Sequence, residues 1–568
     1  MEVKVWDERK LKVENERENL DGEEFCLPIE ELKKRADDFI ARVNRQRMLE
    51  ARLLLVGDQD NQHCYRLNNL RMLEDTNFWG SVYTTRFALP HQRDSGGKII
   101  VLATLASWLP APGTSIYNAS KAALLILFET LRIELGSDVH ILIVTPGFIE
   151  SEATQGKFPT PEGRVDVDED WRDVQMSVIP VETVSGCAKA IVNSACRGDK
   201  CLAEPAWFRV TCILHMNIRR RGTRLALVAL REDHLLAVAS KASRCWELSM
   251  CSGVSKIEYG KRIVDKEIEH FGHNENVSGK VVLITGAASG IGEQISYEYA
   301  KRGACLVLVD IKEDRLGAVV EKARNLGSPD VIAVGADVSK VEDSERFVRV
   351  AVDHFGRLDH LVNNAGIIVS GQLKDTKNLL PRRVMDVNFW GTIYSTHFAL
   401  PHLTKSKGKI IVIASTLGWY PAPKLGFYVA SKAAVINFYE SLRSEIGGDV
   451  GITIVTPGLI KSEMTDNLAK KEKVDLIIPL ESKEACAKAI VKSGCRGDKY
   501  LVEPSWIRVL YPCKVLYPEH LAYEYATRGA RLALVARRED RLRNVAAMAE
   551  EIGFPDAIII AIIIPGDV

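Results

Sequence analysis

Short runs of apolar residues, each followed by a stretch with helical spacing, recur through the middle of this chain. Strands are predicted at 280–285, 305–310, 331–337 and 358–364, since runs of this length rich in Val, Ile and Leu are typical of strands buried on both faces. Four strand-then-helix units in series predict an α/β fold with a doubly wound parallel sheet covered by helices on both faces. Ligands of such sheets bind at the carboxyl ends of the strands.

The chain also repeats itself at a domain-sized spacing. Tyr117–Lys121 returns as Tyr428–Lys432, 311 positions later, with the same Tyr-x-x-x-Lys spacing. The offset stays constant over 70 residues, which indicates a gapless duplicate and excludes a solenoid of short repeats. It falls to 299 between Cys196 and Cys495, so the second copy lacks twelve residues between Gly458 and Cys495.

These repeats divide the chain into five segments. They are a helical N-terminal segment of unknown function at 1–60, a truncated copy with only the C-terminal half of the unit at 61–215, a fragment and linker at 216–275, the complete unit at 276–517, and a truncated nucleotide-binding fragment at 518–568. The first copy has Thr104 in place of Ser415 and no glycine loop, so we expect it to be inactive. The tail has an apolar run at 557–564, which predicts a strand without neighbours and a risk of aggregation.

Composition and charge exclude several classes of function. Lys plus Arg equals Asp plus Glu at 75 each, so no global field favours nucleic acid or an anionic membrane. The twelve cysteines include no Cys-x-x-Cys pair and no histidine spacing of the zinc kind, so no metal is expected. No apolar run approaches the ~18 residues of a membrane-spanning helix, which favours a cytoplasmic protein.

The first candidate chemistry is a glycine-rich turn after the first predicted strand. Gly286, Gly290 and Gly292 have the spacing G-x-x-x-G-x-G and lead into a helical pattern. Such a turn offers backbone N–H groups and a helix dipole to a pyrophosphate. The second strand ends at Asp310, where a carboxylate accepts hydrogen bonds from the ribose hydroxyls and repels a 2′-phosphate. Asp310 therefore favours NAD, and Lys312 nearby keeps NADP as the alternative.

The second candidate chemistry lies in the other half of the complete unit. Tyr428 and Lys432 are four residues apart at the start of a predicted helix, so both lie on one helix face. Ser415 ends a strand predicted at 409–414, and Asn388 opens another predicted helix. A free tyrosine has a pKa near 10 and is a weak base at neutral pH, so a neighbouring cation such as Lys432 is needed to favour the phenolate.

Taken together, these motifs resemble the short-chain dehydrogenase/reductases. More narrowly, Asn276–Gly286, Asn388–Gly391 and Glu503–Trp506 are similar to plant 11-beta-hydroxysteroid dehydrogenase-like proteins of the steroleosin type, over 276–517. The resemblance implies a Rossmann-type unit. It also implies an oxidoreductase that transfers a hydride between a nicotinamide cofactor and a secondary alcohol or ketone, with a hydroxysteroid or sterol-like substrate.

The resemblance assigns roles to particular residues. Tyr428 would exchange the proton, assisted by Lys432; Ser415 would position the substrate oxygen, and Asn388 would hold a proton-relaying water. The cofactor site would comprise Gly286, Ser289, Gly290, Ile291, Gly292, Asp310, Asp337, Val338, Asn363, Asn364, Ala365, Tyr428, Lys432 and Ser462.

Partners and location follow from the same resemblance. It implies a homodimer formed through the helices that follow Asn388 and Tyr428. Similar proteins carry an apolar anchor before the complete unit, whereas 251–274 is polar here, so the endoplasmic reticulum or oil-body surface is the alternative to the cytoplasm. The competing hypothesis for function is a noncatalytic or misassembled tandem fusion in which the repeats are inactive.

Overall fold

The computed structural model describes two large parts of the chain and several short segments. The described residues are 71–109, 114–136, 138–150, 157–159, 165–167, 181–205, 275–373, 380–446, 448–472, 480–505, 507, 533–536 and 558–561. We call the described residues within 71–205 the half-unit and those within 275–507 the complete unit. The helix expected within 1–60 and the fragment expected within 216–274 lie outside the described residues.

The complete unit contains one sheet in which all neighbouring strands are parallel. In sheet order the strands are β14 (Tyr500–Glu503), β11 (Gly451–Pro457), β10 (Lys409–Ile413), β9 (His360–Asn363), β6 (Val281–Thr285), β7 (Cys305–Asp310) and β8 (Val331–Gly335). The chain starts at the inner strand β6, runs outward to β8, and returns to β9 on the other side of β6. This reversal opens a crevice at the carboxyl ends of β6 and β9. The predicted doubly wound α/β fold is confirmed.

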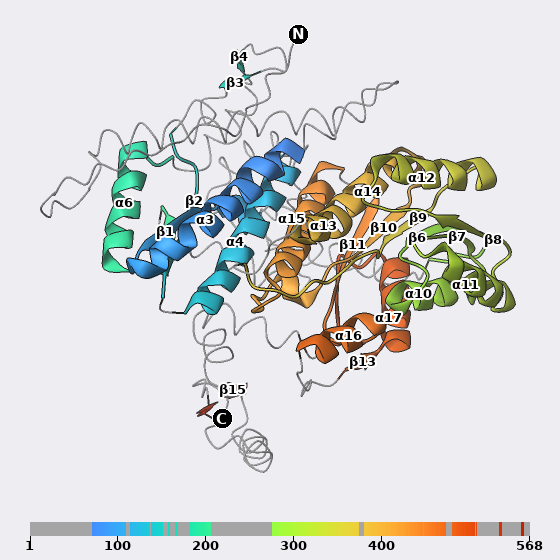
Figure 1. Cartoon of the computed structure of the whole chain (residues 1–568). Coiled ribbons are helices and arrows are strands. Elements are labelled where there is room, and N and C mark those ends of the chain that lie inside the picture. Colours follow the sequence, from blue (N-terminus) through green and yellow to red (C-terminus); the bar gives the residue numbers. More distant parts are fainter. Residues whose placement is uncertain are drawn as a thin grey trace, which may run out of the picture.

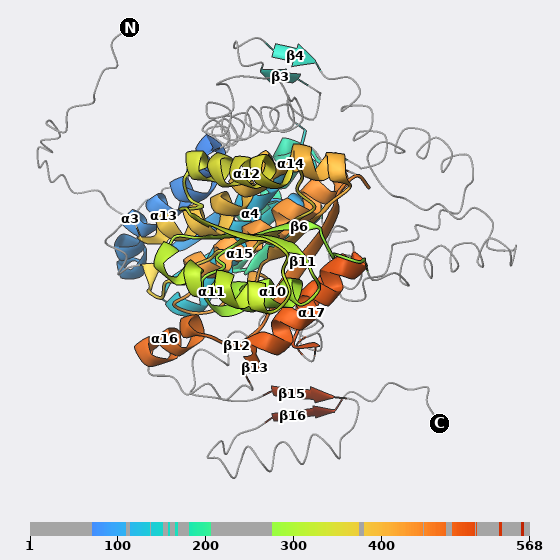
Figure 2. The same ribbon diagram turned by 90° about the vertical axis from the view of Figure 1, so that its right-hand side faces the viewer.

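Helices cover both faces of this sheet (Figure 2). One face carries α10 (Gly290–Ala300), α11 (Glu313–Asn325) and α17 (Lys483–Arg496), and the other carries α12 (Val341–Phe355), α14 (Gly391–Ser406) and α15 (Gly426–Glu445). Successive strand residues point to opposite faces: Ile284 packs in the first layer and Leu283 in the second. None of the helices in the part of the chain that the structure describes is long and apolar enough to cross a membrane.

The helix that contains Asn388 differs from the expected one. Asn388 lies in a π-helical turn, η4 (Asp386–Trp390), which connects α13 (Leu380–Met385) directly to α14. The prediction that Asn388 opens a helix is therefore wrong. A π-helical turn leaves no mark in the spacing of apolar residues, and such turns are frequent at functional sites.

The half-unit repeats the second half of the complete unit. Its strands β1 (Lys98–Leu102), β2 (His140–Pro146) and β5 (Cys201–Glu204) form a parallel sheet, flanked by α3 (Gly80–Asp94), α4 (Ser115–Leu135) and α6 (Val184–Arg197). Lys98 lies opposite His140, as Lys409 lies opposite Gly451 at the positions 311 later. Within its sheet β1 is an edge strand, where the equivalent β10 pairs with β9.

The half-unit packs on the complete unit through α4 and α15, which lie side by side and antiparallel (Figure 1). The Asn118 amide donates to Ser441 Oγ at 3.1 Å, and at the opposite end the Lys424 backbone N–H donates to Glu134 at 2.7 Å. Buried apolar side chains of both parts form one continuous core on this side. The face that the resemblance assigns to homodimer formation is thus covered by the half-unit. A homodimer through this face would require the half-unit to be displaced.

Equivalent residues exchange contacts across this interface. Arg71 forms an ion pair with Asp386. Arg382, which stands 311 positions after Arg71, forms an ion pair with Asp75, which stands 311 positions before Asp386. Reciprocal pairs of this kind are the property of an interface between two-fold related subunits. The half-unit therefore sits on the complete unit as a second subunit would.

The tail contains a strand pair. β15 (Ala533–Ala536) and β16 (Ile558–Ala561) are parallel, and Ala533 lies opposite Ile558, as Val307 lies opposite Ile332 in β7 and β8. The expectation that the apolar run at 557–564 has no neighbouring strand is wrong, because an earlier part of the same tail supplies one. The predicted aggregation risk rested on a strand without a neighbour, and β15 supplies that neighbour.

Candidate active site

The glycine turn lies between the end of β6 and the start of α10. Gly286 and Gly290 have φ angles of +67° and +65°, which favour glycine. A Cβ atom on Gly286 would lie 2.8 Å from the Cα atom of Ala365, and one on Gly292 would overlap the carbonyl oxygen of Gly286. The turn therefore requires glycine at Gly286 and Gly292 because the backbone after β9 and the first turn of α10 approach it closely.

Hydrogen bonds tie this turn to the loop after β9. Thr285 Oγ1 accepts from the backbone N–H groups of Asn364 at 3.1 Å and Ala365 at 3.2 Å. The Asn364 side-chain amide donates to the carbonyl oxygens of Thr285 at 2.9 Å and Gly286 at 3.0 Å. These bonds hold the two loops together at the switch point of the sheet.

Asp310 lies at the carboxyl end of β7, beside the glycine turn. Its carboxylate accepts from the backbone N–H groups of Ala288 and Lys312, both at 2.9 Å. An ionised carboxylate has about four acceptor positions, so two remain for the hydroxyl groups of a ligand. Asp310 is half-buried and lines the cavity described below.

Two other predicted cofactor residues have clear surroundings. Asp337 follows β8, and its carboxylate accepts from the Ser339 hydroxyl at 2.7 Å. The Asn363 side chain is buried on the opposite side of the strand end, and its amide donates to Thr396 Oγ1 and Tyr439 Oη at 2.9 Å. Asn363 does not line the cavity, and its side chain connects the sheet to α14 and α15, whereas Asn364 lines the cavity.

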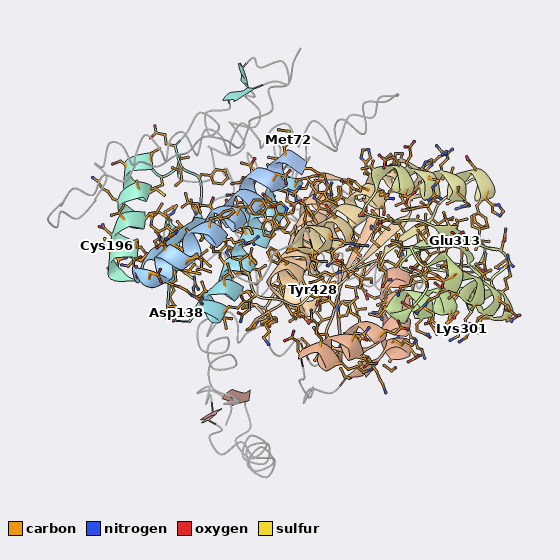
Figure 3. The ribbon with its side chains drawn as sticks, viewed as in Figure 1. Met72, Asp138, Cys196, Lys301, Glu313 and Tyr428 are labelled. Carbon is orange, nitrogen blue, oxygen red and sulfur yellow. The ribbon has the colours of Figure 1, made fainter. Side chains whose placement is uncertain are left out.

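Ser415, Tyr428 and Lys432 come together at the carboxyl end of β10. Tyr428 forms a side-chain hydrogen bond with Ser415. Lys432 Nζ donates to the carbonyl oxygen of Ile413 at 2.9 Å and lies 6.0 Å from the centroid of the Tyr428 ring. Figure 3 shows Tyr428 near the start of α15. The side chains predicted from sequence spacing are therefore brought together.

Asn388 supports this group from behind. Its Oδ1 accepts from the backbone N–H of Ile367 at 2.8 Å, and its amide donates to the Ile367 carbonyl at 2.9 Å and to Ser431 Oγ at 3.0 Å. Asn388 is fully buried and does not line the cavity. Its contacts fix the loop after β9 against α15.

Burial moves the pKa values of Tyr428 and Lys432 in opposite directions. It raises the pKa of Tyr428 above 10, although the hydrogen bond from Ser415 partly lowers it. Burial lowers the pKa of Lys432 to about 8, because the charged ammonium is desolvated. Lys432 is therefore still mainly cationic at pH 7, whereas Tyr428 is a neutral phenol.

One cavity of about 880 Å³ connects the glycine turn to Tyr428. Most of the predicted site residues line it: Gly286, Ser289, Gly290, Ile291, Asp310, Asp337, Val338, Asn364, Ala365, Ser415, Tyr428, Lys432 and Ser462. Beyond Tyr428 the lining is mainly apolar and includes side chains that sequence motifs did not indicate: Ile368, Leu417, Tyr420, Leu425, Leu459, Met464, Leu468 and Ile507. Their positions in loops and in α16 (Glu463–Glu472) carry no spacing signal.

The half-unit also contributes to this cavity, which sequence analysis did not predict. Glu129, Arg132 and Ile133 from α4, with Lys200 and Cys201 at the start of β5, line its outer part. These residues are more than 200 positions from Tyr428 in the sequence. Only the packing of α4 on α15 brings them to the site.

The half-unit keeps parts of the same arrangement without a glycine turn. Lys121 Nζ donates to the Leu102 carbonyl at 2.9 Å, as Lys432 does to Ile413. The Asn77 amide donates to Ser120 Oγ at 3.1 Å, but its buried Oδ1 has no hydrogen-bond partner among the described residues. In the complete unit the loop after β9 satisfies that atom, and the half-unit has no such loop.

Comparisons with known proteins agree with this geometry. The sequence profile described as short chain dehydrogenase matches residues 57–162 and 280–473. The chain is 52% identical over 253 residues to 11-beta-hydroxysteroid dehydrogenase-like 4A of Arabidopsis thaliana. The matched residues make up 44% of this chain and 84% of that protein. It is 50% identical over 265 residues to 11-beta-hydroxysteroid dehydrogenase A of Arachis hypogaea, covering 44% of this chain and 76% of that protein.

Proposed function

The chain belongs to the short-chain dehydrogenase family, and we propose that its complete unit transfers a hydride between a nicotinamide dinucleotide and a secondary alcohol or ketone. The observation that carries the proposal is the single cavity that joins the glycine turn to Tyr428, Ser415 and Lys432. A cofactor-binding turn and a proton-exchanging group must face the same space for hydride and proton transfer to be coupled.

The residues around the turn fit a dinucleotide. Glycine at 286 and 292 lets the turn pack closely against Ala365 and the start of α10. α10 begins at Gly290, and Gly290 and Ile291 line the cavity, so a pyrophosphate bound there would lie at the N-terminus of this helix. Asp310 retains acceptor positions for ribose hydroxyls, which supports NAD. Lys312 adjoins Asp310 and keeps NADP as the alternative.

Proton exchange is assigned to Tyr428. When bound, the nicotinamide ring accepts or donates the hydride. In alcohol oxidation, Tyr428 Oη accepts the hydroxyl proton, and in ketone reduction it returns that proton to the carbonyl oxygen. Ser415, already hydrogen-bonded to Tyr428, is placed to donate to the same substrate oxygen.

Lys432 and Asn388 prepare Tyr428 for this role. Burial raises the pKa of Tyr428, which opposes proton acceptance at neutral pH. Positive charge from Lys432, which is mainly protonated at pH 7, shifts the balance toward the phenolate. Asn388 holds the Ile367 backbone and Ser431, so we assign it a positioning role.

The substrate side of the cavity favours a large apolar molecule. Its lining beyond Tyr428 is mainly aliphatic and aromatic. The names of the similar proteins point to 11β-hydroxysteroids. We therefore propose a hydroxysteroid or sterol-like substrate. The cytoplasmic location stays a prediction. Because the half-unit covers the face of α15, we propose a monomer in place of the expected homodimer.

Fluorescence titration with NADH and NADPH tests the cofactor assignment on the full chain. Saturable quenching of the protein's tryptophan fluorescence is expected, with tighter binding of NADH than of NADPH. Asp310→Asn keeps the acceptor to Ala288 and removes the charge, so it should shift the ratio of the two dissociation constants by about tenfold toward NADPH. An unchanged ratio would contradict the role of Asp310.

The same titration separates the enzyme from an inactive tandem fusion. A misassembled chain has no intact crevice between β6 and β9 and should give no saturable quenching. Quenching followed by turnover of an 11β-hydroxysteroid supports the enzyme. Quenching without turnover of any secondary alcohol tested would leave only a binding protein.

A further inference from the structure

We propose that the half-unit is a working part of the substrate site, in which α4 and β5 form the outer wall of the cavity and Ile133 and Cys201 select the far end of the substrate. This inference rests on the proposed function of the complete unit. It assigns to a truncated copy, expected to be inactive, a role in the specificity of the other copy.

The wall is held in place by the interface already described. Glu134, one residue after Ile133, accepts from the backbone N–H of Lys424 at 2.7 Å, and Leu425 next to it lines the cavity. The Arg132 guanidinium of α4 donates to the Lys200 carbonyl at 2.6 Å, just before β5, and lies 3.6 Å from Sγ of Cys201, the first residue of β5. The end of α4 and the start of β5 are therefore linked to each other, and α4 is linked to the loop that leads to Tyr428.

The equivalent positions of the complete unit show what is particular about this wall. Cys201 aligns in strand register with Tyr500, since Ile143 lies opposite Cys201 as Ile454 lies opposite Tyr500. The Tyr500 hydroxyl donates to Glu440 at 2.8 Å, and the Arg443 guanidinium carbon lies 4.8 Å from its ring centroid.

The half-unit keeps both neighbours of that tyrosine, as Glu129 and Arg132, and both line the cavity. Cysteine in place of tyrosine therefore leaves space at the wall that a ring would fill. Ile133 likewise replaces the polar Ser444 and is the one aliphatic side chain beside Glu129, Arg132 and Lys200 among the described residues that line the wall. A pair of complete units would present Tyr500 and Ser444 in these places.

The consequence concerns the class of substrate. The more open wall accepts a secondary alcohol that is long enough to reach from Tyr428 to the half-unit. Short alcohols do not reach α4 or β5, so the wall should not affect them. Substitutions in the wall should therefore change the KM for long substrates and leave the KM for short ones unchanged.

Cys201 and Cys196 provide an internal comparison. Both are exposed cysteines of the half-unit that form no disulfide among the described residues, but of the two only Cys201 lines the cavity. Cys196 lies on α6, at the outer edge of the molecule and far from Tyr428 (Figure 3). The rate of maleimide alkylation of each can be followed by peptide mass spectrometry on the full chain.

NADH with an 11β-hydroxysteroid forms a pair that cannot exchange hydride, so the complex persists during labelling. Alkylation of Cys201 should slow about tenfold in this complex, whereas that of Cys196 stays unchanged. Saturable quenching by NADH without protection of Cys201 overturns the proposed role of the half-unit and leaves the proposed function standing. Absence of both quenching and protection overturns the proposed function and the role of the half-unit together.

Substitution gives a second readout. Cys201→Tyr should raise the KM for the steroid about tenfold and leave the KM for cyclohexanol unchanged, and Ile133→Ser should act in the same direction. Cys196→Tyr adds the same side chain to the half-unit outside the cavity and should change neither. Equal effects on steroid and cyclohexanol, or none, overturn the assignment of these residues to specificity.

Discussion

Trp79 and Trp390 donate their indole N–H groups to the two oxygens of one carboxylate, that of Glu74. The two tryptophans occupy equivalent positions 311 residues apart, whereas the position equivalent to Glu74 is Met385. The interface is therefore reciprocal at its ion pairs but unequal at its centre. In a pair of complete units Met385 would stand in place of Glu74 and could not accept these hydrogen bonds. The contact therefore favours packing of the half-unit on α15 over packing of a second chain.

Burial raises the pKa of Glu74 to about 7, with smaller opposing effects from both indoles and Arg71, while Asp386 raises it further. Since the folded pKa exceeds the unfolded value of 4.5, the proton stabilises the folded state. That stabilisation is complete below about pH 4.5 and is lost as the pH rises through 7. Its size is about 3 kcal/mol.

Glu74→Gln should remove most of this pH dependence. Thermal unfolding of the parent chain and of the variant, followed from pH 4.5 to 8, measures it. We expect the parent to lose more stability than the variant over this interval, since other titrating groups are common to both. Parallel curves would contradict a protonated Glu74 in the docked state.

The chain should be a monomer of 63.2 kDa in solution. The half-unit covers the face formed by α15, where a Cβ on Gly426 would lie 2.9 Å from Leu127 Cδ1. Leu127→Arg places an unpaired charge in this buried seam and should separate the two parts, which exposes α15 and produces larger species. Light scattering coupled to size-exclusion chromatography measures both masses. A parent chain of twice the expected mass would contradict the monomer.

Tyr428→Phe should lower turnover by about 10³-fold while NADH quenching stays unchanged, because the ring remains and only the proton-exchanging hydroxyl is lost. Tyr117→Phe is the matched control at the equivalent position of the half-unit. It should leave turnover intact, since Tyr117 does not line the cavity. Steady-state rates with an 11β-hydroxysteroid compare the two, and full activity of Tyr428→Phe would refute the assignment.

Gly292→Ala should abolish saturable NADH quenching, because its Cβ would overlap the Gly286 carbonyl and push α10 away from the turn. Gly290→Ala makes a useful comparison: its Cβ would meet open space, although its φ of +65° strains any other residue by ~1 kcal/mol. The NADH dissociation constant should rise far more in the first variant. Similar values for both would contradict a dominant role for close packing at Gly292.

The fold class could be predicted from the sequence, and most of the site residues predicted in the same way line the cavity that contains Tyr428. Apolar strands followed by helices have few ways to pack, so four such units predict a parallel sheet, and Gly286, Asp310 and Ser415 stand at strand ends or next to them. Since parallel strands end at one edge of the sheet, residues distant in sequence were expected to meet there.

The directions of individual side chains and the contacts between the two copies could not be predicted in this way, because both depend on the folded structure. Asn363 and Asn364 are adjacent in sequence, but strand geometry turns Asn363 into the helix layer and leaves Asn364 at the cavity. The place of the half-unit follows from side-chain complementarity along α4 and α15, a long-range property with no local signal in the chain. That packing brings Ile133 and Cys201 to the cavity of the other copy, and sequence spacing alone could not have revealed it.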